Sequence, residues 1–321
     1  AVTITASEQA ELLPIEPDTR PLGPQEVTGR TLVTLISVGT ELSGAYRRGP
    51  FPRTLGYAAV FEIEGTGPEV TGLSVGERVF CMGPHRSFQR CDASEVLRLP
   101  EHLSPEVAVF ARMMGVSMST LSTTTVRPPE KVLVTGLGLV GHLAAKMFSV
   151  CGYQVTGCDP WAARRDLALQ NGIPTVLPAV PLEDPSYAGQ VGLVLECSAH
   201  EQAALDACRI VRKGGEVVLV GTPWQKNTDL SAHELLHAVF HNYVVLRSGW
   251  EWQIPLRPAE FRGNSLFGNM GAAMQWLAEG RIKVDSLYDV APPRDAQRVY
   301  QDFHHRRART LTTLFDWTTC R

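Results

Sequence analysis

Apolar strands and amphipathic helices alternate along the middle of the chain, beginning at Lys131. Short apolar runs bounded by turn residues predict strands, and stretches with apolar residues three and four positions apart predict helices. The expected strands lie near residues 132–135, 154–158, 192–196, 216–220 and 243–247. The expected helices lie near residues 140–151, 161–171, 201–211 and 231–240. This alternation predicts a doubly wound parallel sheet of the α/β class.

The flanking regions have a different pattern. Residues 1–125 are β-rich, and the strands and the helix expected there lie near residues 31–37, 58–64 and 106–124. Beyond residue 252, two helices and a closing strand are expected near residues 269–279, 293–306 and 311–315. We therefore predict a parallel-sheet domain at residues 126–261, inserted into a β-rich domain made of residues 1–125 and 262–321.

The composition is that of an ordinary globular protein. With 321 residues the chain is long for one hydrophobic core, which agrees with two domains. A formal net charge of −3 gives no reason to expect nucleic acid or an anionic membrane as a partner. The sequence has no apolar run of membrane-spanning length and no signal-peptide pattern. Its 7 cysteines are scattered without a CxxC pair, so we expect reduced thiols and a cytoplasmic location.

The first strand of the alternating region runs directly into a glycine pattern, Gly136-Leu-Gly-Leu-Val-Gly141. Between a strand and a helix, this GxGxxG spacing is typical of a dinucleotide-binding Rossmann fold. Gly136 permits the tight turn, Gly138 lets the backbone approach a pyrophosphate, and Gly141 lets the helix pack close to the sheet. The first N–H groups of the helix would bind the phosphates. A glycine-bearing turn without a ligand is the alternative interpretation.

Asp159 ends the second strand of the alternating region. A carboxylate at this place accepts hydrogen bonds from the ribose hydroxyls and repels a 2′-phosphate, which favours NAD(H) over NADP(H). Arg164 and Arg165 argue mildly for the phosphorylated cofactor. The sequence therefore predicts NAD as the cofactor, with NADP as the less favoured choice.

Motifs along nearly the whole chain fit one family. They are Gly39-Thr-Glu-Leu42, Leu55-Gly-Tyr-Ala-Ala-Val-Phe-Glu62, Gly76-Glu-Arg-Val79, the glycine pattern, Glu196-Cys-Ser198 and Gly214-Gly-Glu-Val-Val-Leu-Val-Gly-Thr-Pro223. Together they resemble the medium-chain dehydrogenase/reductase superfamily. The resemblance implies a Rossmann domain and a β-rich, GroES-like catalytic domain. Within the superfamily, the chain is similar to a zinc-free branch related to threonine-dehydrogenase-like and bacteriochlorophyllide-dehydrogenase-like proteins.

The chain departs from the zinc-dependent members at the positions that supply catalytic ligands. Val38 replaces a cysteine, and Gly56-Tyr-Ala58 replaces a Gly-His-Glu step. The segment in which the third ligand is expected, residues 110–114, holds no Cys, His, Asp or Glu. The four-cysteine lobe that binds structural zinc is also missing from the sequence. Because zinc requires three or four such ligands, we predict neither a catalytic nor a structural zinc.

Without a metal, hydrogen-bond donors would have to stabilise the developing alkoxide. The resemblance implies Thr40 as the hydroxyl beside the substrate oxygen, and Tyr57, at the position of the lost histidine, as a donor or proton relay. The alternatives are an ST-turn for Thr40 and an aromatic wall for Tyr57. Glu41 matches an acidic position that makes structural bonds near the site. His85 is a candidate general base, with a surface-loop histidine as the alternative.

The resemblance also implies cofactor contacts beyond the three glycines. Val140 would lie behind the nicotinamide ring, Arg164 would reach the adenosine ribose, and Ser198 would lie in the loop beside the cofactor. The other positions that the resemblance assigns to the cofactor are Leu139, Gly221 and Thr222.

These assignments favour a small-molecule substrate. We predict a metal-independent oxidoreductase that transfers hydride between NAD(H) and a secondary alcohol or ketone, such as a sugar-like, cyclitol or specialised-metabolite compound. A quinone or enoyl (C=C) reductase and a non-catalytic NAD-binding protein are the alternatives. Edge pairing through the strand at residues 243–247 would form a two-fold homodimer, as the resemblance suggests.

One motif points elsewhere. His233-Glu-Leu-Leu-His237 matches the HExxH motif of metalloproteases, and His241 follows on the same helical face. The motif falls in the last crossover helix of the parallel-sheet region, so a partly exposed structural helix is the preferred interpretation. We expect the apolar side of this helix to consist of Leu235, Leu236, Val239 and Phe240.

Overall fold

The structure is a computed structural model that describes residues 1–16 and 18–320. The chain forms two compact units. Unit 1 comprises Ala1–Arg112, Met274–Gly280 and Val284–Arg321, and unit 2 comprises Met113–Ala273 and Arg281–Lys283. Unit 2 includes more residues than the domain predicted at residues 126–261. The predicted domain boundaries stay a proposal.

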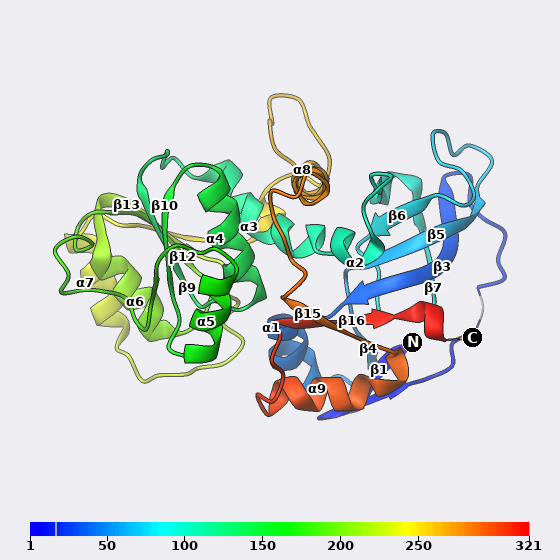
Figure 1. Cartoon of the computed structure of the whole chain (residues 1–321), viewed down its shortest axis with the longest axis horizontal. Coiled ribbons are helices and arrows are strands. Elements are labelled where there is room, and N and C mark those ends of the chain that lie inside the picture. Colours follow the sequence, from blue (N-terminus) through cyan, green and yellow to red (C-terminus); the bar gives the residue numbers. More distant parts are fainter. Residues whose placement is uncertain (17, 321) are drawn as a thin grey trace. The chain divides into compact units, whose positions relative to one another are not determined.

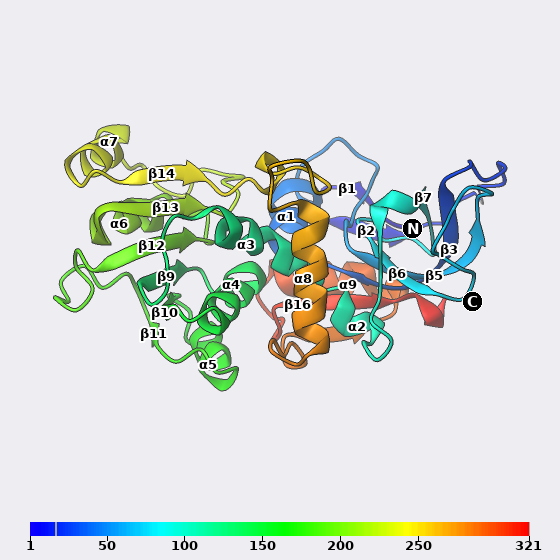
Figure 2. The same cartoon turned by 90° about the horizontal axis from the view of Figure 1, so that it is seen from above.

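Within the described residues, unit 2 is built on a sheet of six parallel strands (Figure 1). Their spatial order is β11 (Val176–Leu177), β10 (Gln154–Cys158), β9 (Lys131–Thr135), β12 (Val191–Glu196), β13 (Val211–Leu219) and β14 (Val245–Ser248). Figure 2 shows the strands in this order. The order changes direction between β9 and β12, as in a Rossmann fold. The predicted doubly wound sheet is confirmed.

Helices cover both faces of this sheet. On one face lie α4 (Leu139–Val150) and α5 (Ala162–Gln170), whose Phe148 and Ala168 join one buried cluster. On the other lie α6 (Glu201–Ile210) and α7 (Ala232–His241), whose Leu205 and Ala238 join a second cluster. Because both faces are buried, the strands of this sheet appear in the sequence as nearly continuous apolar runs. Three further elements are α3 (Ala111–Thr123), η3 (Glu251–Gln253) and α8 (Leu266–Ala278).

In the part of the chain that the structure describes, unit 1 holds two sheets. The larger contains β15 (Tyr288–Ala291), β16 (Thr312–Asp316), β3 (Glu26–Leu35), β5 (Ala59–Thr66), β6 (Arg78–Cys81) and β8 (Val96–Arg98), with β7 (Phe88–Asp92) paired to β3. The smaller contains β2 (Gln9–Leu12), β1 (Val2–Ala6) and β4 (Arg53–Thr54). Since β16 pairs with β3, both ends of the chain contribute to this β-rich unit.

Two helical segments of unit 1 carry Thr40 and Glu41. After β3, the short helix α1 (Val38–Thr40) continues into the turn η1 (Glu41–Tyr46). Tyr46 of this turn stacks on Tyr300 of α9 (Ala296–His304), with ring centroids 5.1 Å apart. The remaining elements are η2 (Ala93–Glu95), α2 (Pro105–Ala108), η4 (Pro293–Asp295) and η5 (Trp317–Thr319).

Some details differ from the sequence predictions. The helix expected at residues 106–124 is divided into α2 and α3, and the two-residue strand β11 was not expected. The predicted apolar side of α7 is partly wrong, because Leu236 and Phe240 are 66% and 75% exposed. The buried side of α7 instead centres on Ala238. Across residues 1–16 and 18–320, no helix is both long and apolar enough to span a membrane.

Candidate functional site

The glycine turn of unit 2 leaves no room for side chains at its two ends. Gly136 has a φ of +81°, and a Cβ there would lie 2.7 Å from the Ser198 nitrogen. A Cβ on Gly141 would lie 1.9 Å from the carbonyl oxygen of Gly136. Both glycines are therefore required by the backbone conformation and by close packing.

Gly138 is different, because a Cβ at this position would meet no described atom within 4 Å. It is the N-cap residue of α4, and it has no side chain with which to cap the helix. The first-turn N–H groups of α4, including those of the buried Leu139 and the half-buried Val140, can therefore serve an anion. Open space at a helix N-terminus, beside the point where the strand order reverses, fits the pyrophosphate of a dinucleotide.

The buried carboxylate of Asp159 fixes the glycine turn by accepting hydrogen bonds from the backbone. It is only 2% exposed, and its two oxygens accept hydrogen bonds from the backbone nitrogens of Leu137 at 2.8 Å and Trp161 at 2.9 Å. The Arg164 guanidinium lies 3.4 Å from one of these oxygens and 4.4 Å from the centroid of the Trp161 ring. Oδ2 also accepts from Arg164, so Oδ1 is the oxygen with a second lone pair for a ribose hydroxyl, and such contact would require greater exposure of Asp159.

Glu196 holds the neighbouring loop at the end of β12. Its buried carboxylate accepts hydrogen bonds from the nitrogens of Ser198 and Ala199, at 2.8 and 3.0 Å, and from the hydroxyls of Ser198 and Thr135. Burial raises the pKa of Glu196, and these hydrogen bonds oppose that rise. The hydroxyl of Ser198 is therefore directed to Glu196 in this structure.

Gly221 and Thr222 extend the same edge of the sheet. The Gly221 nitrogen donates to the backbone oxygen of Glu196 at 2.7 Å, and a Cβ on Gly221 would lie 2.5 Å from the Ala199 nitrogen. Thr222 is exposed. Together with the approach of Gly136 to Ser198, these contacts bring the predicted cofactor positions of three loops to one edge of unit 2.

In unit 1, Tyr57 is the centre of a polar cluster. This residue precedes β5, and its hydroxyl donates a hydrogen bond to Ser37 Oγ and is also hydrogen-bonded to Thr40. Burial raises the pKa of Tyr57, and the hydrogen bonds to Ser37 and Thr40 oppose this effect. Because the pKa stays above its ordinary value, Tyr57 is protonated at neutral pH and can act as a hydrogen-bond donor.

Glu41 lies next to this cluster and is buried. Its Oε1 accepts a hydrogen bond from the Ser37 nitrogen at 2.8 Å. Its Oε2 accepts one from the Tyr300 hydroxyl and lies 3.1 Å from Nε2 of His85. Burial and the nearby Glu41 raise the pKa of Tyr300 well above its usual value, so this phenol remains a donor. The carboxylate therefore fixes the segment that carries Ser37.

His85 is fully buried, so the surface-loop interpretation is wrong. Its Nδ1 lies 2.7 Å from the hydroxyl of Thr34, which in turn accepts a hydrogen bond from Nε1 of Trp317 at 2.9 Å. An ionised carboxylate can only accept, so an ionised Glu41 would require Nε2 of His85 to be the donor between them. A general-base role for His85 stays a prediction, and it would require a substrate to reach a buried ring.

The side chains at the expected zinc positions do not fit a zinc ion. Val38 is aliphatic and packs against the core of unit 1, and Ala58 is a buried methyl group. Tyr57 offers a protonated phenol, and Arg112, from the segment of the third ligand, lies over the Tyr57 ring at 4.7 Å. Zinc binds thiolate, imidazole or carboxylate groups, and a guanidinium repels a cation. These four residues supply none of the required ligands.

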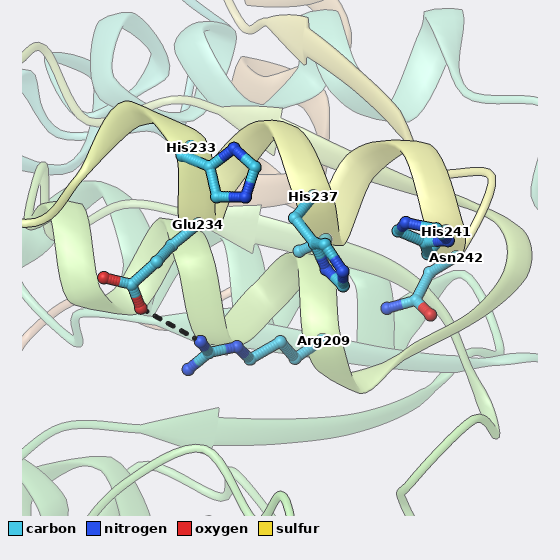
Figure 3. A pocket seen from close by; sticks show the side chains of 7 residues that line it. Arg209, His233, Glu234, His237, His241 and Asn242 are labelled. Carbon is cyan, nitrogen blue, oxygen red and sulfur yellow. Dashed lines mark hydrogen bonds and ion pairs between the residues drawn. The ribbon is translucent and has the colours of Figure 1, made fainter.

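The HExxH match forms an exposed face of α7 (Figure 3). The rings of His233 and His237 have centroids 6.1 Å apart, and those of His237 and His241 are 4.1 Å apart. Glu234, the would-be general base, forms an ion pair with Arg209 at 3.3 Å. Within residues 1–16 and 18–320, no group of three or more His, Cys, Asp or Glu side chains is arranged to hold a metal ion. The arrangement gives no support to a metalloprotease.

Three residues of the unit 1 cluster were not expected from the sequence: Ser37, Arg112 and Tyr300. A signal existed for Arg112, because a single charge in the otherwise apolar segment at residues 110–114 is unusual in a helix that is buried. Ser37 and Tyr300 carried no local signal, since their partners lie 20 and 259 positions away in the sequence.

Comparisons with known proteins agree with the fold. The family described as zinc-binding dehydrogenase matches residues 140–251, a region of unit 2 that excludes Val38 and Tyr57. An alcohol dehydrogenase of Geobacillus stearothermophilus is 25% identical over 85% of this chain and 88% of its own. The L-galactonate-5-dehydrogenase of Escherichia coli is 26% identical over 53% of this chain and 61% of its own. The crystal structure of galactitol-1-phosphate dehydrogenase from Escherichia coli aligns with a TM-score of 0.83 at 17% identity, covering 98% and 99% of the two chains.

The parallel sheet, the glycine turn and these relatives support an oxidoreductase with a Rossmann fold. In sequence and fold the chain is similar to members of the medium-chain dehydrogenase/reductase superfamily.

Proposed function

We propose that this protein is a metal-independent oxidoreductase that transfers hydride between NAD(H) and a secondary alcohol or its ketone. A sugar-like, cyclitol or specialised-metabolite compound is the substrate class that we favour, and the alcohol and galactonate dehydrogenases among the relatives support it. One observation carries the proposal. At the position of a zinc ligand, Tyr57 presents a protonated phenol that is hydrogen-bonded to Ser37 and Thr40.

We assign the cofactor to the glycine edge of unit 2. The open space at Gly138 and the N-terminus of α4 would receive the pyrophosphate. The bound cofactor would supply the hydride chemistry, with NAD⁺ as the acceptor in alcohol oxidation and NADH as the donor in ketone reduction. The carboxylate of Asp159 disfavours a 2′-phosphate, whereas Arg164 beside it is the group that would accommodate one. Calorimetry should show tighter binding of NADH than of NADPH, and the reverse order would contradict this assignment.

Tyr57 and Thr40 would handle the proton. In ketone reduction the oxygen gains a proton as the carbon gains a hydride, and the protonated Tyr57 would donate it. Thr40, which is hydrogen-bonded to the same phenol, would help to orient the substrate oxygen. In alcohol oxidation the phenolate would accept the proton, so the oxidation rate should rise with pH. Glu41 and His85 would hold the Ser37 segment in place.

A substrate panel tests the reaction class. Secondary alcohols, ketones, quinones and enones are each supplied with NAD(H) or NADP(H), in the presence of a metal chelator. We expect interconversion of alcohols and ketones with NAD(H) that is unaffected by the chelator. Turnover restricted to quinones or enones with NADPH would instead indicate a reductase. NAD binding without turnover of any compound would indicate a non-catalytic protein.

We also propose a homodimer that forms through the edge of the unit 2 sheet. β14 is the last strand of that sheet, and its Val245 is 49% exposed. The open edge of such a strand can pair with a second strand, here from another copy of the chain. Light scattering should give the mass of a dimer, and Val245→Lys should give monomers. A monomeric wild-type protein would contradict the proposal.

A further inference from the structure

A buried arginine contacts the proposed acid–base residue. Arg112, near the start of α3, is 4% exposed, and its guanidinium carbon lies 4.7 Å from the centroid of the Tyr57 ring. Removing a charged side chain from water is costly unless its surroundings compensate for the lost hydration. The face of an aromatic ring supplies part of that compensation, because its π electrons attract a cation. The charge of Arg112 therefore interacts directly with the ring of Tyr57.

The same two residues come from the sequence positions that related zinc enzymes use for metal ligands. Tyr57 replaces the histidine ligand, and Arg112 lies in the segment of the third ligand. The fold of unit 1 brings these segments together, so that a fixed side-chain cation faces the phenol. A metal ion would polarise the substrate oxygen directly, whereas a guanidinium has no open coordination position and must act through a neighbouring group.

We propose that Arg112 supplies the positive charge that a metal supplies in related enzymes, and that it does so as a positioning residue acting through Tyr57. In this role it stabilises the phenolate that remains when Tyr57 has given its proton to the substrate oxygen. In the structure the Tyr57 O–H donates to Ser37 Oγ. For the transfer this O–H would turn to the substrate oxygen, and the Ser37 hydroxyl would donate to the phenol oxygen instead. The inference rests on the proposed function, in which Tyr57 is the proton donor.

The proton transfer is balanced without a further reactant. In reduction, the O–H bond of Tyr57 breaks as the O–H bond of the alcohol forms, while the carbonyl carbon receives the hydride. The negative charge that remains on Tyr57 is next to Arg112 and is hydrogen-bonded to Ser37 and Thr40. A proton from solvent then restores the phenol, which is only partly buried. Oxidation reverses each step.

Two charged groups act on Tyr57 in opposite directions. Arg112 on α3 favours the phenolate, and Glu41 on η1 disfavours it. Burial is the largest influence and raises the pKa of Tyr57, while the hydrogen bonds to Ser37 and Thr40 lower it. Without the charge of Arg112, burial and Glu41 would act with less opposition, so the pKa of Tyr57 would rise further.

The pH dependence of turnover tests this role. In alcohol oxidation, the plot of rate against pH should have a rising limb that reports the ionisation of Tyr57. In Arg112→Met this limb should lie about one pH unit higher. At a fixed pH below the limb, alcohol oxidation should then be slower by about tenfold. Arg112→Lys keeps the charge and should restore most of the rate, and Tyr57→Phe should abolish the limb. An unshifted limb in Arg112→Met would overturn the proposal, as would equal shifts in the Met and Lys variants.

A second readout needs no substrate. The ultraviolet absorbance of tyrosinate is titrated in each variant, and the contribution of Tyr57 is obtained by subtracting the titration of the same protein carrying Tyr57→Phe. A raised Tyr57 pKa in Arg112→Met, in a protein that turns over no alcohol, would support the role of Arg112 and refute the proposed function. An unchanged Tyr57 pKa in Arg112→Met, in a protein that still turns over alcohol, would refute the role of Arg112 and support the proposed function. If Arg112→Met fails to fold, Arg112→Gln serves as the neutral variant, and circular dichroism checks both.

Discussion

Asp159 and Glu196 of unit 2 each accept hydrogen bonds from two main-chain N–H groups, whereas Glu41 of unit 1 accepts one. In unit 1, Glu41 depends in part on the side chain of Tyr300, from a helix far along the sequence. Main-chain donors are present whenever the fold forms, whereas a side-chain donor requires one particular residue at a distant position.

This contrast indicates where the fold can change its chemistry. The proposed cofactor edge of unit 2 is determined largely by glycines and backbone groups, so it can remain the same while the reaction changes. The cluster around Tyr57 in unit 1 is determined by side chains, so a few substitutions can replace one chemistry by another. The predictions below test each side of the contrast, beginning with the largest expected effect.

The largest effect is expected from Gly141→Ala in unit 2. Its Cβ would lie 1.9 Å from the backbone oxygen of Gly136, so the glycine turn would have to move. We expect the free energy of unfolding to fall by about 3–5 kcal/mol, and binding of NADH to be lost. Gly263→Ala, where a Cβ meets no described atom within 4 Å, is the matched control. Equal stability of the two variants in urea unfolding would show that the close approach of Gly141 to the backbone of Gly136 is not required for the turn.

His142 of unit 2 tests what a buried side chain without hydrogen-bond partners costs. It is fully buried, and neither ring nitrogen has a hydrogen-bond partner among residues 1–16 and 18–320. Burial, reinforced by the charge of Lys146, lowers the pKa of His142 to about 3. The unfolded chain, with an ordinary histidine pKa of about 6.5, takes up the proton first. The contribution of His142 to the free energy of unfolding is therefore fully present above about pH 6.5. It is lost as the pH falls toward the pKa of His142 in the folded state, about 3.

The expected loss for the wild type between about pH 7 and about pH 4 is about 3 kcal/mol from this residue alone. His142→Leu should remove that loss, and His102→Gln, at an exposed histidine, should not. Chemical unfolding at both pH values measures the difference. The interpretation fails if the Leu variant loses as much stability in acid as the wild type.

Tyr57→Phe tests the side-chain chemistry of unit 1. Removing the hydroxyl leaves the ring beside Arg112 but eliminates the proposed donor, so kcat should fall by about 10²-fold, equivalent to about 2.7 kcal/mol. Thr40→Val should cause a loss of similar size if its hydroxyl helps in the transition state. Tyr187→Phe, a change in unit 2 that removes only a contact with Thr156, is the control. Unchanged kinetics in both site variants would rule out this mechanism.

Gly138→Ala should have the smallest effect on folding and a specific effect on the cofactor. Since a Cβ at this position meets no described atom within 4 Å, the unfolding free energy should change little. The methyl group would occupy the space that we assign to the pyrophosphate, and affinity for NADH should fall by about tenfold, or about 1.4 kcal/mol. Calorimetry with the wild type as reference measures this. Unchanged affinity would show that the pyrophosphate does not bind at Gly138.

The sequence predicts unit 2 better than unit 1, for a physical reason. Its strands and helices each bury a regular face, and its glycine pattern is continuous in sequence, so local information is sufficient. The exception is β11, which has only two residues, Val176 and Leu177, and therefore no periodicity to detect. Exposed apolar residues such as Phe240 were also predicted wrongly, because a local pattern does not indicate whether a helix face is covered.

In unit 1 the deciding contacts are between residues that are far apart in sequence. The family resemblance pointed to Tyr57 and Glu41, but their partners Ser37 and Tyr300, and the contact of Arg112 with Tyr57, became evident only in three dimensions. No local pattern predicts that a serine after one strand will meet a tyrosine before another. The roles of Thr40 and Tyr57 in catalysis stay predictions for the experiments above.

The most direct test of a metal-free acid–base site is turnover by metal-stripped protein. The protein is dialysed against a chelator, its zinc content is measured, and kcat is determined with NAD(H) and the best alcohol or ketone from the panel. We predict that the stripped wild type keeps its full kcat and that stripped Tyr57→Phe loses about 10²-fold. Loss of wild-type activity on stripping, with recovery on addition of Zn²⁺, would contradict the account.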